Sequence, residues 1–441
     1  MPTPVIAIFD IGKTNKKLFL FDEDYRIVFE NSESLPEIKD EDGEACEDLQ
    51  KLEDFIRQSV EKIFSKKEFD VRAINFSAYG ASLVYIDEKG NPLTPLYNYL
   101  KKYPAPLQKK FYDQYGGEKK FSLETASPVL GSLNSGMQLY RIKNAKPGIF
   151  VRIRYALHLP QYLSYLICGN PVSDMTSIGC HTNLWSFEKN EYHRWVEEEK
   201  IRGILAPIVS ADSTSQIALQ GHPVAVGTGL HDSSAALIPY LQCMDGPFVL
   251  ISTGTWCVSL NPFSHAALTV EQLQNDCLTY LTHEGRPVKA SRLFAGHEHE
   301  EQTKKLSSYF NKPAGYYSSL AFDEHFLKAG FAGDDLSRYG SYEEAYHAFV
   351  QGLVKKQADA LQLILEGSVV KRIFVDGGFS KNRVYMHVLS RFFPGMDVFA
   401  ASIPQASAIG AAMVIHRAWN KKILPDQVIS LDRYGDKKSI V

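Results

Sequence analysis

Two short stretches of one design, about 240 residues apart, constrain the fold of this chain more than any other feature. The first runs from Val5 to Asp22 and places a turn of Gly, Lys, Thr and Asn between two apolar runs. The second runs from Phe248 to Leu260 and has a turn of Ser, Thr and Gly in the same position. Apolar runs that flank a polar, glycine-containing turn predict β-hairpins with a buried first strand. One such hairpin near the start of each half predicts two related domains that face each other across a ligand.

The first hairpin combines a carboxylate with a turn that suits a phosphate chain. Asp10 ends the first strand, and Gly12 lets the backbone turn tightly enough to aim successive N–H groups inward. Such a concavity favours phosphate, and the carboxylate favours the Mg²⁺ that accompanies a nucleotide. An isolated turn of this kind is more often a plain hairpin loop. It is not a Walker A loop, because Ala7 stands where that loop needs glycine and Lys17 to Phe21 continues as strand.

Composition and charge are those of an ordinary globular protein. With 441 residues, 44% apolar and 22% charged, the chain is long enough for two or three domains. A net charge of −3 gives no support for a nucleic-acid or membrane partner. The six cysteines form no Cys-x-x-Cys pair, and no apolar run approaches the ~18 residues of a membrane span. The apolar run before Asp10 is too short for a signal peptide, so we expect a reduced, cytoplasmic protein.

Hydrophobic periodicity predicts an α/β chain in which strands and helices alternate. The helices expected from apolar spacing, capping signals and helix stops span residues 47–65, 159–167, 233–241, 341–367 and 382–392, with a last helix from Pro404. The strands beyond the two hairpins are expected at 71–77, 83–86, 224–226, 372–375 and 398–400. Residues 32–54 are strongly acidic and are interpreted as a solvated loop that leads into a helix.

Three patterns resemble functional motifs but fail on spacing. Gly227-x-Gly229 is not a dinucleotide fingerprint, because Asp232 occupies its third glycine position. The segment 378–382 ends in asparagine and therefore lacks the Gly-x-Ser-x-Gly elbow of hydrolases. The cluster 297–301 has two histidines without the His-Glu-x-x-His spacing, so we interpret it as the solvated face of a helix.

Four motifs, in order along nearly the whole chain, resemble the FGGY family of carbohydrate kinases. They are the first phosphate motif Asp10-Ile11-Gly12-Lys13-Thr14-Asn15-Lys16-Lys17, the catalytic segment Gly229-Leu230-His231-Asp232-Ser233-Ser234-Ala235-Ala236, the second phosphate motif Ser252-Thr253-Gly254-Thr255-Trp256, and the adenosine motifs 376–382 and 404–412. The resemblance implies two ribonuclease-H-like domains of the actin-like ATPase fold with a cleft between them. It implies an N-terminal domain over residues 1–240 and a C-terminal domain over residues 241–441.

The resemblance also implies the cofactors, ATP and Mg²⁺, and a role for each motif residue. Asp232 is expected to be the base that takes the proton of a sugar hydroxyl, and Asp10 to hold Mg²⁺ through water. The residues expected around the phosphates are Gly12, Lys13, Thr14, Asn15, Lys16, Lys17, Thr253, Gly254 and Thr255. Those expected near the nucleoside are Gly377, Gly378 and Asn382. The sugar-side candidates are Ser77, Tyr79, Gly80, Gln161, His231, Asp232 and Trp256. Taken singly, each of these polar residues could equally cap a helix or a turn.

Departures from the family pattern leave the substrate open. Where many members have aromatic-x-Asp-x-Arg, this chain has Tyr97-Asn-Tyr99-Leu-Lys101-Lys102; His283-Glu284-Gly285 replaces Asn-Glu-Gly of rhamnulokinases; and Gln405 replaces an acidic residue. The His-Asp pair and Gly-Thr-Trp nonetheless favour a ketose such as L-rhamnulose or L-fuculose. The alternatives are another ketose or polyol (xylulose, ribulose or a glycerol-like compound), another kinase of the superfamily such as an acetate or hexose kinase, or a non-catalytic actin-like ATPase. A homodimer also remains open. A sugar-sensing repressor would need a DNA-binding segment, for which the first strand at residue 5 leaves no room.

Overall fold

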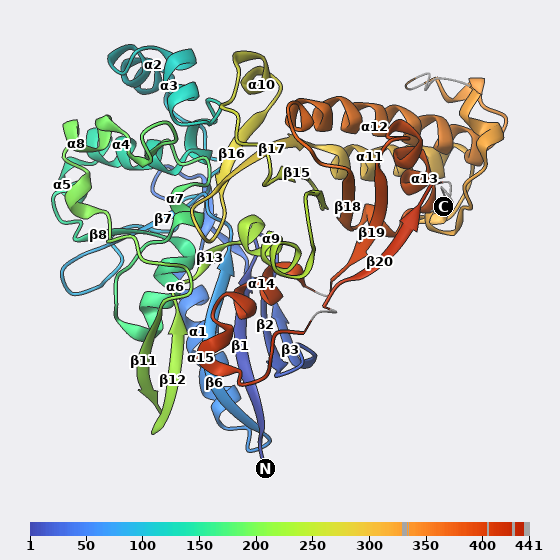
Figure 1. Ribbon diagram of the computed structural model, residues 1–441. Coiled ribbons are helices and arrows are strands. Elements are labelled where there is room, and N and C mark those ends of the chain that lie inside the picture. The colour runs from blue at the N-terminus through green and yellow to red at the C-terminus, as the bar shows by residue number, and fades with distance from the viewer. Residues whose placement is uncertain (329–332, 334, 404, 426–427, 436–441) are drawn as a thin grey trace.

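The computed structural model describes residues 1–328, 333, 335–403, 405–425 and 428–435 (Figure 1). In this part of the chain, two seven-stranded sheets share one plan, each built around the first strand of a predicted hairpin. The two hairpins, which begin at β1 and at β14, are therefore confirmed.

The first sheet is centred on β1. The order of its strands is β11 (Thr214–Leu219), β12 (His222–Gly227), β6 (Phe69–Ala78), β1 (Thr3–Ile11), β2 (Lys16–Asp22) and β3 (Ile27–Glu33), with β13 (Leu230–His231) paired to β6. β1, β2 and β3 form an antiparallel meander, whereas β6 is parallel to β1 and β12 is parallel to β6. Strand β1 thus joins an antiparallel half of the sheet to a parallel half.

The second sheet repeats this arrangement around β14. The order of its strands is β16 (Cys277–Leu281), β17 (Pro287–Leu293), β15 (Cys257–Asn261), β14 (Val249–Thr253), β18 (Arg372–Gly377), β19 (Asp397–Ser402) and β20 (Ser430–Tyr434). β15 and β17 continue antiparallel from β14, and β18 and β19 lie parallel to it on the other side. The strands of the first sheet all precede residue 240, and those of the second all follow residue 241.

Alternation along β1 assigns its two faces to different helices. Val5, Ala7 and Phe9 share a core with α1 (Leu49–Phe64) and α6 (Leu159–Cys168). Ile6 and Ile8 face the opposite way and share a core with α9 (Asp232–Cys243) and α14 (Ala406–Val414). Successive side chains of a strand point to opposite faces. Asp10, the next even residue of β1, therefore belongs to the face covered by α9 and α14.

Helices α9 and α14 lie between the two sheets at the centre of the molecule (Figure 1). The core that they share also takes Leu250 and Phe374 from the second sheet. The small residues at the start of α14 serve this packing: a Cβ on Gly410 would lie 1.9 Å from the carbonyl oxygen of Ala235 in α9. Asn75 of the first sheet donates to the carbonyl of Ala411, 2.8 Å away. The predicted start of this helix, Pro404, lies outside the described residues.

The outer face of the second sheet is covered by long helices. α12 (Tyr342–Leu365) and α13 (Arg383–Phe392) share a core with Val249 and Ile251 of β14. Ser341 caps α12 by accepting from the N–H of Glu344, as the capping signal predicts, but the Glu344 carboxylate bonds the N–H of Gly340. α10 (Val270–Gln274) and α11 (Ala295–Tyr309) also belong to this lobe.

Between β6 and β11 the chain builds a helical cap on the first lobe (Figure 1). Its helices and its small sheet are α2 (Ala105–Gln114), α3 (Glu118–Glu124), α4 (Ser135–Ala145), α5 (Pro147–Phe150), α7 (Met175–Ile178), α8 (Arg194–Glu198), β7 (Leu83–Ile86) and β8 (Tyr155–His158). They surround an aromatic core in which Phe111 contacts the rings of Tyr140 and Trp195.

Two interpretations of the sequence are wrong. The acidic stretch 32–54 is not a solvated loop throughout, because it contains the hairpin β4 (Glu37–Lys39) and β5 (Ala45–Glu47). In this stretch Asp40 and Glu47 are buried and form ion pairs with lysines from distant segments. The cluster 297–301 is not wholly solvated, because His299 is buried and its Nε2 lies 2.9 Å from the Tyr346 hydroxyl. In both cases a partner far away in sequence removes the polar group from water.

Candidate active site

Asp10 lies where β1, β6 and α14 meet. Ser77, which is aligned with it on β6, flanks it on one side. From the first turn of α14, the Ser407 hydroxyl donates to Oδ1 of Asp10, 3.1 Å away. A predicted phosphate-motif residue is thus held by a helix from the other half of the chain. The sequence alone could not supply this contact, because Ser407 is 397 positions away.

The surroundings of Asp10 raise the pKa of its carboxyl. Its pKa is raised from 3.8 to about 6, first by burial and then by the negative charge of Asp232. The hydroxyls of Ser407 and Ser77 and the ammonium of Lys17 act in the opposite direction. Asp10 and Asp232, the predicted metal-binding and catalytic residues, are therefore near enough for the charge of one to act on the other.

Asp232 is the first residue of α9, directly after β13. Its side chain is 36% exposed, and Oδ1 accepts from the N–H of Ser233 at 2.6 Å. The N-cap position of α9 belongs to His231, so Asp232 lies inside the helix. A partly exposed carboxylate can accept a proton from a bound molecule.

His231 supports Asp232 from a buried position. Its Nε2 lies 3.2 Å from Oδ1 of Asp232 and 3.1 Å from the thiol of Cys180, and its Nδ1 lies 3.3 Å from the Ser234 hydroxyl. Burial lowers the pKa of His231, while the charge of Asp232 acts to raise it. The imidazole is therefore neutral at pH 7 and orients the carboxylate without a full positive charge.

The loop that precedes Asp232 packs against α6 and accepts a hydrogen bond from it. Gly229 has φ +78°, and a Cβ there would lie 2.3 Å from the carbonyl oxygen of Pro160. Gln161 is fully buried and donates to the carbonyl of Gly229 at 2.7 Å and to Asp174 at 3.0 Å. In this structure Gln161, a predicted sugar-side residue, thus bonds the catalytic loop. Gly80 is another predicted sugar-side residue. It leaves room for the ring of His231, because a Cβ at position 80 would lie 2.7 Å from that ring.

The three lysines of the first phosphate motif differ in their surroundings. Lys16 is buried, and its ammonium pairs with Glu47 at 2.8 Å and donates to the carbonyls of Gly12 and Lys13. Lys13 pairs with Glu37 at 2.6 Å. Lys17 is aligned with Asp10 on the neighbouring strand and helps to lower its pKa. Lys17 is the lysine of this motif whose charge acts on the carboxylate site.

In the turns of both phosphate hairpins a glycine N–H donates across the turn, over three residues in the first and two in the second. The N–H of Gly12 donates to the carbonyl of Asn15, and that of Gly254 donates to the carbonyl of Trp256, both at 3.0 Å. Thr14, Asn15, Gly254 and Thr255 are exposed at the tips of the two turns. Each lobe therefore presents an equivalent exposed turn, as the duplicated motif predicts.

The second hairpin is joined to the predicted nucleoside motif through Gly377. This residue has φ +87°, and a Cβ there would lie 2.0 Å from the carbonyl oxygen of Thr253. The hydroxyl of Thr253 donates to the carbonyl of Asp376 at 2.5 Å, and the N–H of Gly378 donates to the carbonyl of Thr253 at 3.1 Å. The space around Gly378 is open. This geometry explains the glycine at 377, whereas no contact within the described residues requires a glycine at 378.

Two predicted contact residues have structural partners of their own. Asn382 caps α13 by accepting from the N–H of Tyr385 at 3.1 Å, and its amide donates to the Tyr346 hydroxyl at 2.7 Å. Trp256 is 45% exposed, and its ring lies 4.5 Å from that of Phe294 and 5.5 Å from the guanidinium of Arg292, both in its own lobe.

Several residues that lie near the site were not predicted from the sequence. The pKa of Tyr99 is raised to about 12 by burial and then by the charge of Asp232, and its ring lies 5.6 Å from that of Tyr79. Tyr280 comes from β16 of the second lobe, and its ring lies 5.5 Å from that of His231. Glu47 accepts from the Tyr79 hydroxyl at 2.9 Å. The departure from the family pattern at residues 97–102 could have indicated a role for Tyr99, whereas nothing in the sequence points to Tyr280.

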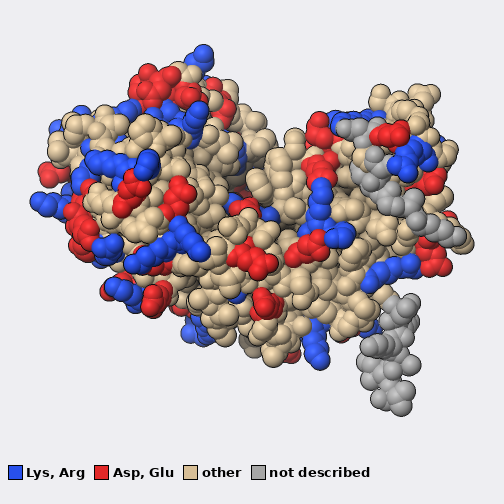
Figure 2. Space-filling model, turned by 90° about the horizontal axis from the view of Figure 1, so that it is seen from above, with Lys and Arg blue, Asp and Glu red and all other residues tan. Residues whose placement is uncertain are grey.

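Three observations concern metal-ligating clusters, membrane-spanning helices and surface charge in the described residues. No three metal-ligating side chains gather anywhere in the described chain. Among the helices that the structure describes, none has both the length and the apolar character needed to cross a membrane. Acidic and basic side chains are intermixed on the face shown in Figure 2, where a hollow separates two masses of the molecule.

Comparison with known families and proteins gives a consistent result. A model of the N-terminal domain of the FGGY family of carbohydrate kinases matches residues 5–238, and a model of the carbohydrate kinase FGGY C-terminal domain matches residues 245–318. A rhamnulokinase from Halalkalibacterium halodurans is 22% identical over 256 residues, which is 56% of this chain and 52% of that protein. The match therefore spans about half the length of this curated relative.

Solved structures resemble the chain over nearly its whole length. A carbohydrate kinase from Novosphingobium aromaticivorans has a TM-score of 0.79 at 23% identity and covers 98% of this chain and 94% of its own. A ligand-bound xylulose kinase from Lactobacillus acidophilus has a TM-score of 0.77 at 17% identity, with coverages of 98% and 93%. At these identities the likeness concerns the fold, and it confirms the predicted two-domain α/β architecture.

Proposed function

Because the chain belongs to the FGGY family of carbohydrate kinases, we propose that it transfers the γ-phosphate of ATP to a hydroxyl of a small sugar. The observation that carries this proposal is the convergence of Asp10 and Asp232. One ends the central strand of the first sheet, the other opens the helix between the sheets, and the charge of Asp232 reaches Asp10 strongly enough to raise its pKa. Two neighbouring carboxylates with different hydrogen-bond partners can take different roles.

Asp232 is the general base of the proposed reaction. Phosphoryl transfer passes through a loose transition state, so the protein mainly positions the groups and neutralises charge. The exposed part of the Asp232 carboxylate accepts the proton of the attacking hydroxyl, while Ser233 and His231 fix its orientation. Ser77, Tyr79, Gly80 and Trp256 remain candidates for the sugar side, and Tyr99 and Tyr280 join them.

The residues around Asp10 fit a magnesium nucleotide. Mg²⁺ is usually bound by one or two carboxylates, several waters and the phosphates of the substrate rather than by a full protein cage. Asp10, with Asp232 nearby, supplies the carboxylates of that pattern. When bound, the ion supplies charge neutralisation at the β- and γ-phosphates. Lys17 adds a positive charge on the same face, and the turns at Gly12 and Gly254 present the phosphate-binding backbone.

The proposed sugar is a ketose such as L-rhamnulose or L-fuculose. This choice is supported by the His231–Asp232 pair and by the relative named rhamnulokinase. Tyr99 stands where many members have a carboxylate, so an apolar or stacking contact replaces a charged one at that position. The alternatives are other ketoses and polyols, including xylulose, ribulose and glycerol.

A panel assay tests the proposal. Purified protein is incubated with Mg-ATP and one sugar at a time, and ADP release is followed with a coupled enzyme assay. We expect ADP release that depends on an added ketose, with a matching amount of sugar phosphate. ADP release that is equal with and without every sugar would indicate an actin-like ATPase that uses water, and would overturn the proposal.

A further inference from the structure

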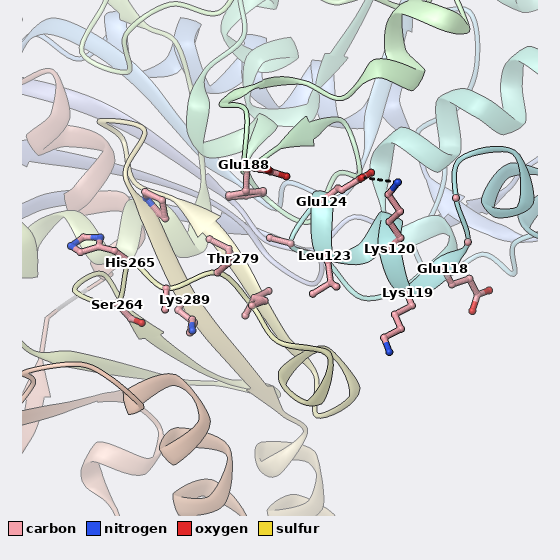
Figure 3. Close-up of a pocket in the computed structure, with 18 residues that line it drawn as sticks. Glu118, Lys119, Lys120, Leu123, Glu124, Glu188, Ser264, His265, Thr279 and Lys289 are labelled. Atoms are coloured by element: carbon pink, nitrogen blue, oxygen red, sulfur yellow. Dashed lines mark ion pairs between the residues drawn. The ribbon is translucent and has the colours of Figure 1, made fainter.

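A large cavity lies away from the candidate active site, between the cap and the second lobe. Its volume is about 820 Å³, within the range of roughly 300–1,000 Å³ that is typical of small-molecule sites. Helix α3 of the cap forms one wall, and β16, β17 and the segment 264–268 form the other (Figure 3). At its floor the N–H of Thr279 donates to the carbonyl of Ala126 at 2.9 Å, which joins cap and lobe.

Lys289 gives this cavity a buried positive charge. Its side chain comes from β17, lies directly across from Thr279 in the sheet, and is only 3% exposed. Its ammonium donates to Oε1 of Gln272 at 3.3 Å, and no carboxylate of the described residues pairs with it. Burial lowers the pKa of Lys289, and interactions with Cys277 and then with the exposed carboxylate of Glu366 act in the opposite direction. A buried ammonium without a counter-ion is costly, because its lost hydration is not replaced.

The other buried lysines of the described chain show the usual solution. Lys16 is 1% exposed and pairs with Glu47 at 2.8 Å. Lys101 is 7% exposed and pairs with Asp40 and Asp42. Lys289 differs from both, because its ammonium is bonded to the neutral amide of Gln272 and its side chain lines the cavity.

The remaining lining indicates an apolar body for a ligand. Leu123, Ala126 and Phe187 lie on the side of the cap, and Ala266, Ala267 and Leu268 on the side of the second lobe. The carboxylate of Glu124, on the α3 wall, is engaged by His193 at 2.9 Å and by Lys120 (Figure 3). Glu118, Lys119 and Glu188 also line the cavity, and Lys289, on the opposite wall, is the buried charge among its lining residues.

The cavity is distinct from the proposed sugar site, although β16 borders both. Thr279 faces the cavity, and Tyr280, the next residue, faces the opposite way, toward His231. Neither Asp10 nor Asp232 lines the cavity. A ligand here would therefore not occupy the position of the sugar.

We propose that this cavity binds an organic anion, with its acidic group on Lys289 and an apolar body against the alanine- and leucine-lined walls. The probe that matches this chemistry is 8-anilinonaphthalene-1-sulfonate, which has an aromatic body and one anionic group. N-phenyl-1-naphthylamine has the same body without the charge and serves as the neutral comparison. Binding of both is followed by fluorescence titration of the full chain, and melting temperatures are recorded for each variant.

The key variant is Lys289→Met, which keeps the length of the side chain and removes the charge. We expect one anionic probe per chain, bound about ten- to a hundred-fold more weakly by the variant, the range for a charge-assisted hydrogen bond. The neutral probe should bind parent and variant within about twofold. Lys119→Met, at an exposed position of the other wall, is the matched control and should change neither probe.

Several results would overturn the proposal. They are an unchanged affinity of Lys289→Met for the anionic probe, an equal loss for both probes, displacement of the probe by ATP, and the absence of saturable binding. If Lys289→Met does not fold, Ala267→Trp fills the cavity and leaves the charge in place. That variant should bind neither probe, and full binding by it would equally refute the site.

Discussion

Replacing Asp10 by asparagine should make the protein more stable while abolishing its function. The pKa of Asp10 is raised from 3.8 to about 6 by burial and by Asp232. A native carboxyl that holds its proton more tightly than the unfolded one lowers stability as pH rises from about 4 to about 6, and the loss persists above that range. A shift of about two pKa units corresponds to roughly 3 kcal/mol. Asparagine has no charge to bury and can still accept from Ser407.

We therefore expect Asp10→Asn to exceed the parent in free energy of unfolding by about 1–3 kcal/mol at pH 7.5, after allowance for weaker hydrogen bonds. Near pH 3, below both pKa values, the difference should nearly vanish, because the parent carboxyl is then largely protonated in both states. Denaturant unfolding of the ligand-free proteins at the two pH values measures the difference. Sugar-dependent turnover at pH 7.5 should fall by at least about a hundredfold, since charge neutralisation at the phosphates is lost. A variant less stable than the parent at pH 7.5, or a stability difference independent of pH, would refute the reasoning.

Three further predictions concern the nucleotide side. Gly377→Ala should lose at least about 2 kcal/mol of stability, because its backbone is left-handed and a Cβ would overlap a carbonyl at 2.0 Å. Gly378→Ala should unfold within about 0.5 kcal/mol of the parent but raise KM for ATP; equal melting temperatures for the two variants would contradict this. Lys17→Met should raise KM for ATP by about tenfold or more, and Lys13→Met, whose ammonium pairs with Glu37 and Glu47 instead, by much less; equal effects would argue against Lys17. In the parent, kcat/KM for Mg-ATP should fall about tenfold per pH unit below about 6, as Asp10 takes up its proton; a flat profile down to pH 5 would exclude this role.

The sequence predicted well where local pattern decides the structure. The two hairpins, the helix at 47–65 and the strand from Arg372 follow from apolar periodicity and turn residues, and the structure contains them at nearly those positions. Asp10 could be placed at the end of a buried strand for the same reason. The equivalence of the two lobes could also be foreseen, because a repeated hairpin implies a repeated sheet order.

The rest depended on contacts between distant segments. From the sequence, Glu47 was interpreted as part of a solvated acidic loop, whereas in the structure it forms an ion pair with Lys16. Gln161 and Asn382 looked like ligand contacts, and in the structure their amides bond the catalytic loop and a helix start. Tyr280 enters the site from the edge of the other sheet, where no local pattern marks it.

The measurement that bears most directly on the proposed function is the turnover of Asp232→Asn. Asparagine keeps the shape of the side chain and its hydrogen bond from Ser233, but it cannot take a proton at neutral pH. We expect sugar phosphorylation to fall by roughly 10²–10⁴-fold, the range for a lost general base, with the melting temperature and the binding of ATP and sugar preserved. Turnover near that of the parent would show that Asp232 only shapes the start of α9, and would contradict the proposed mechanism.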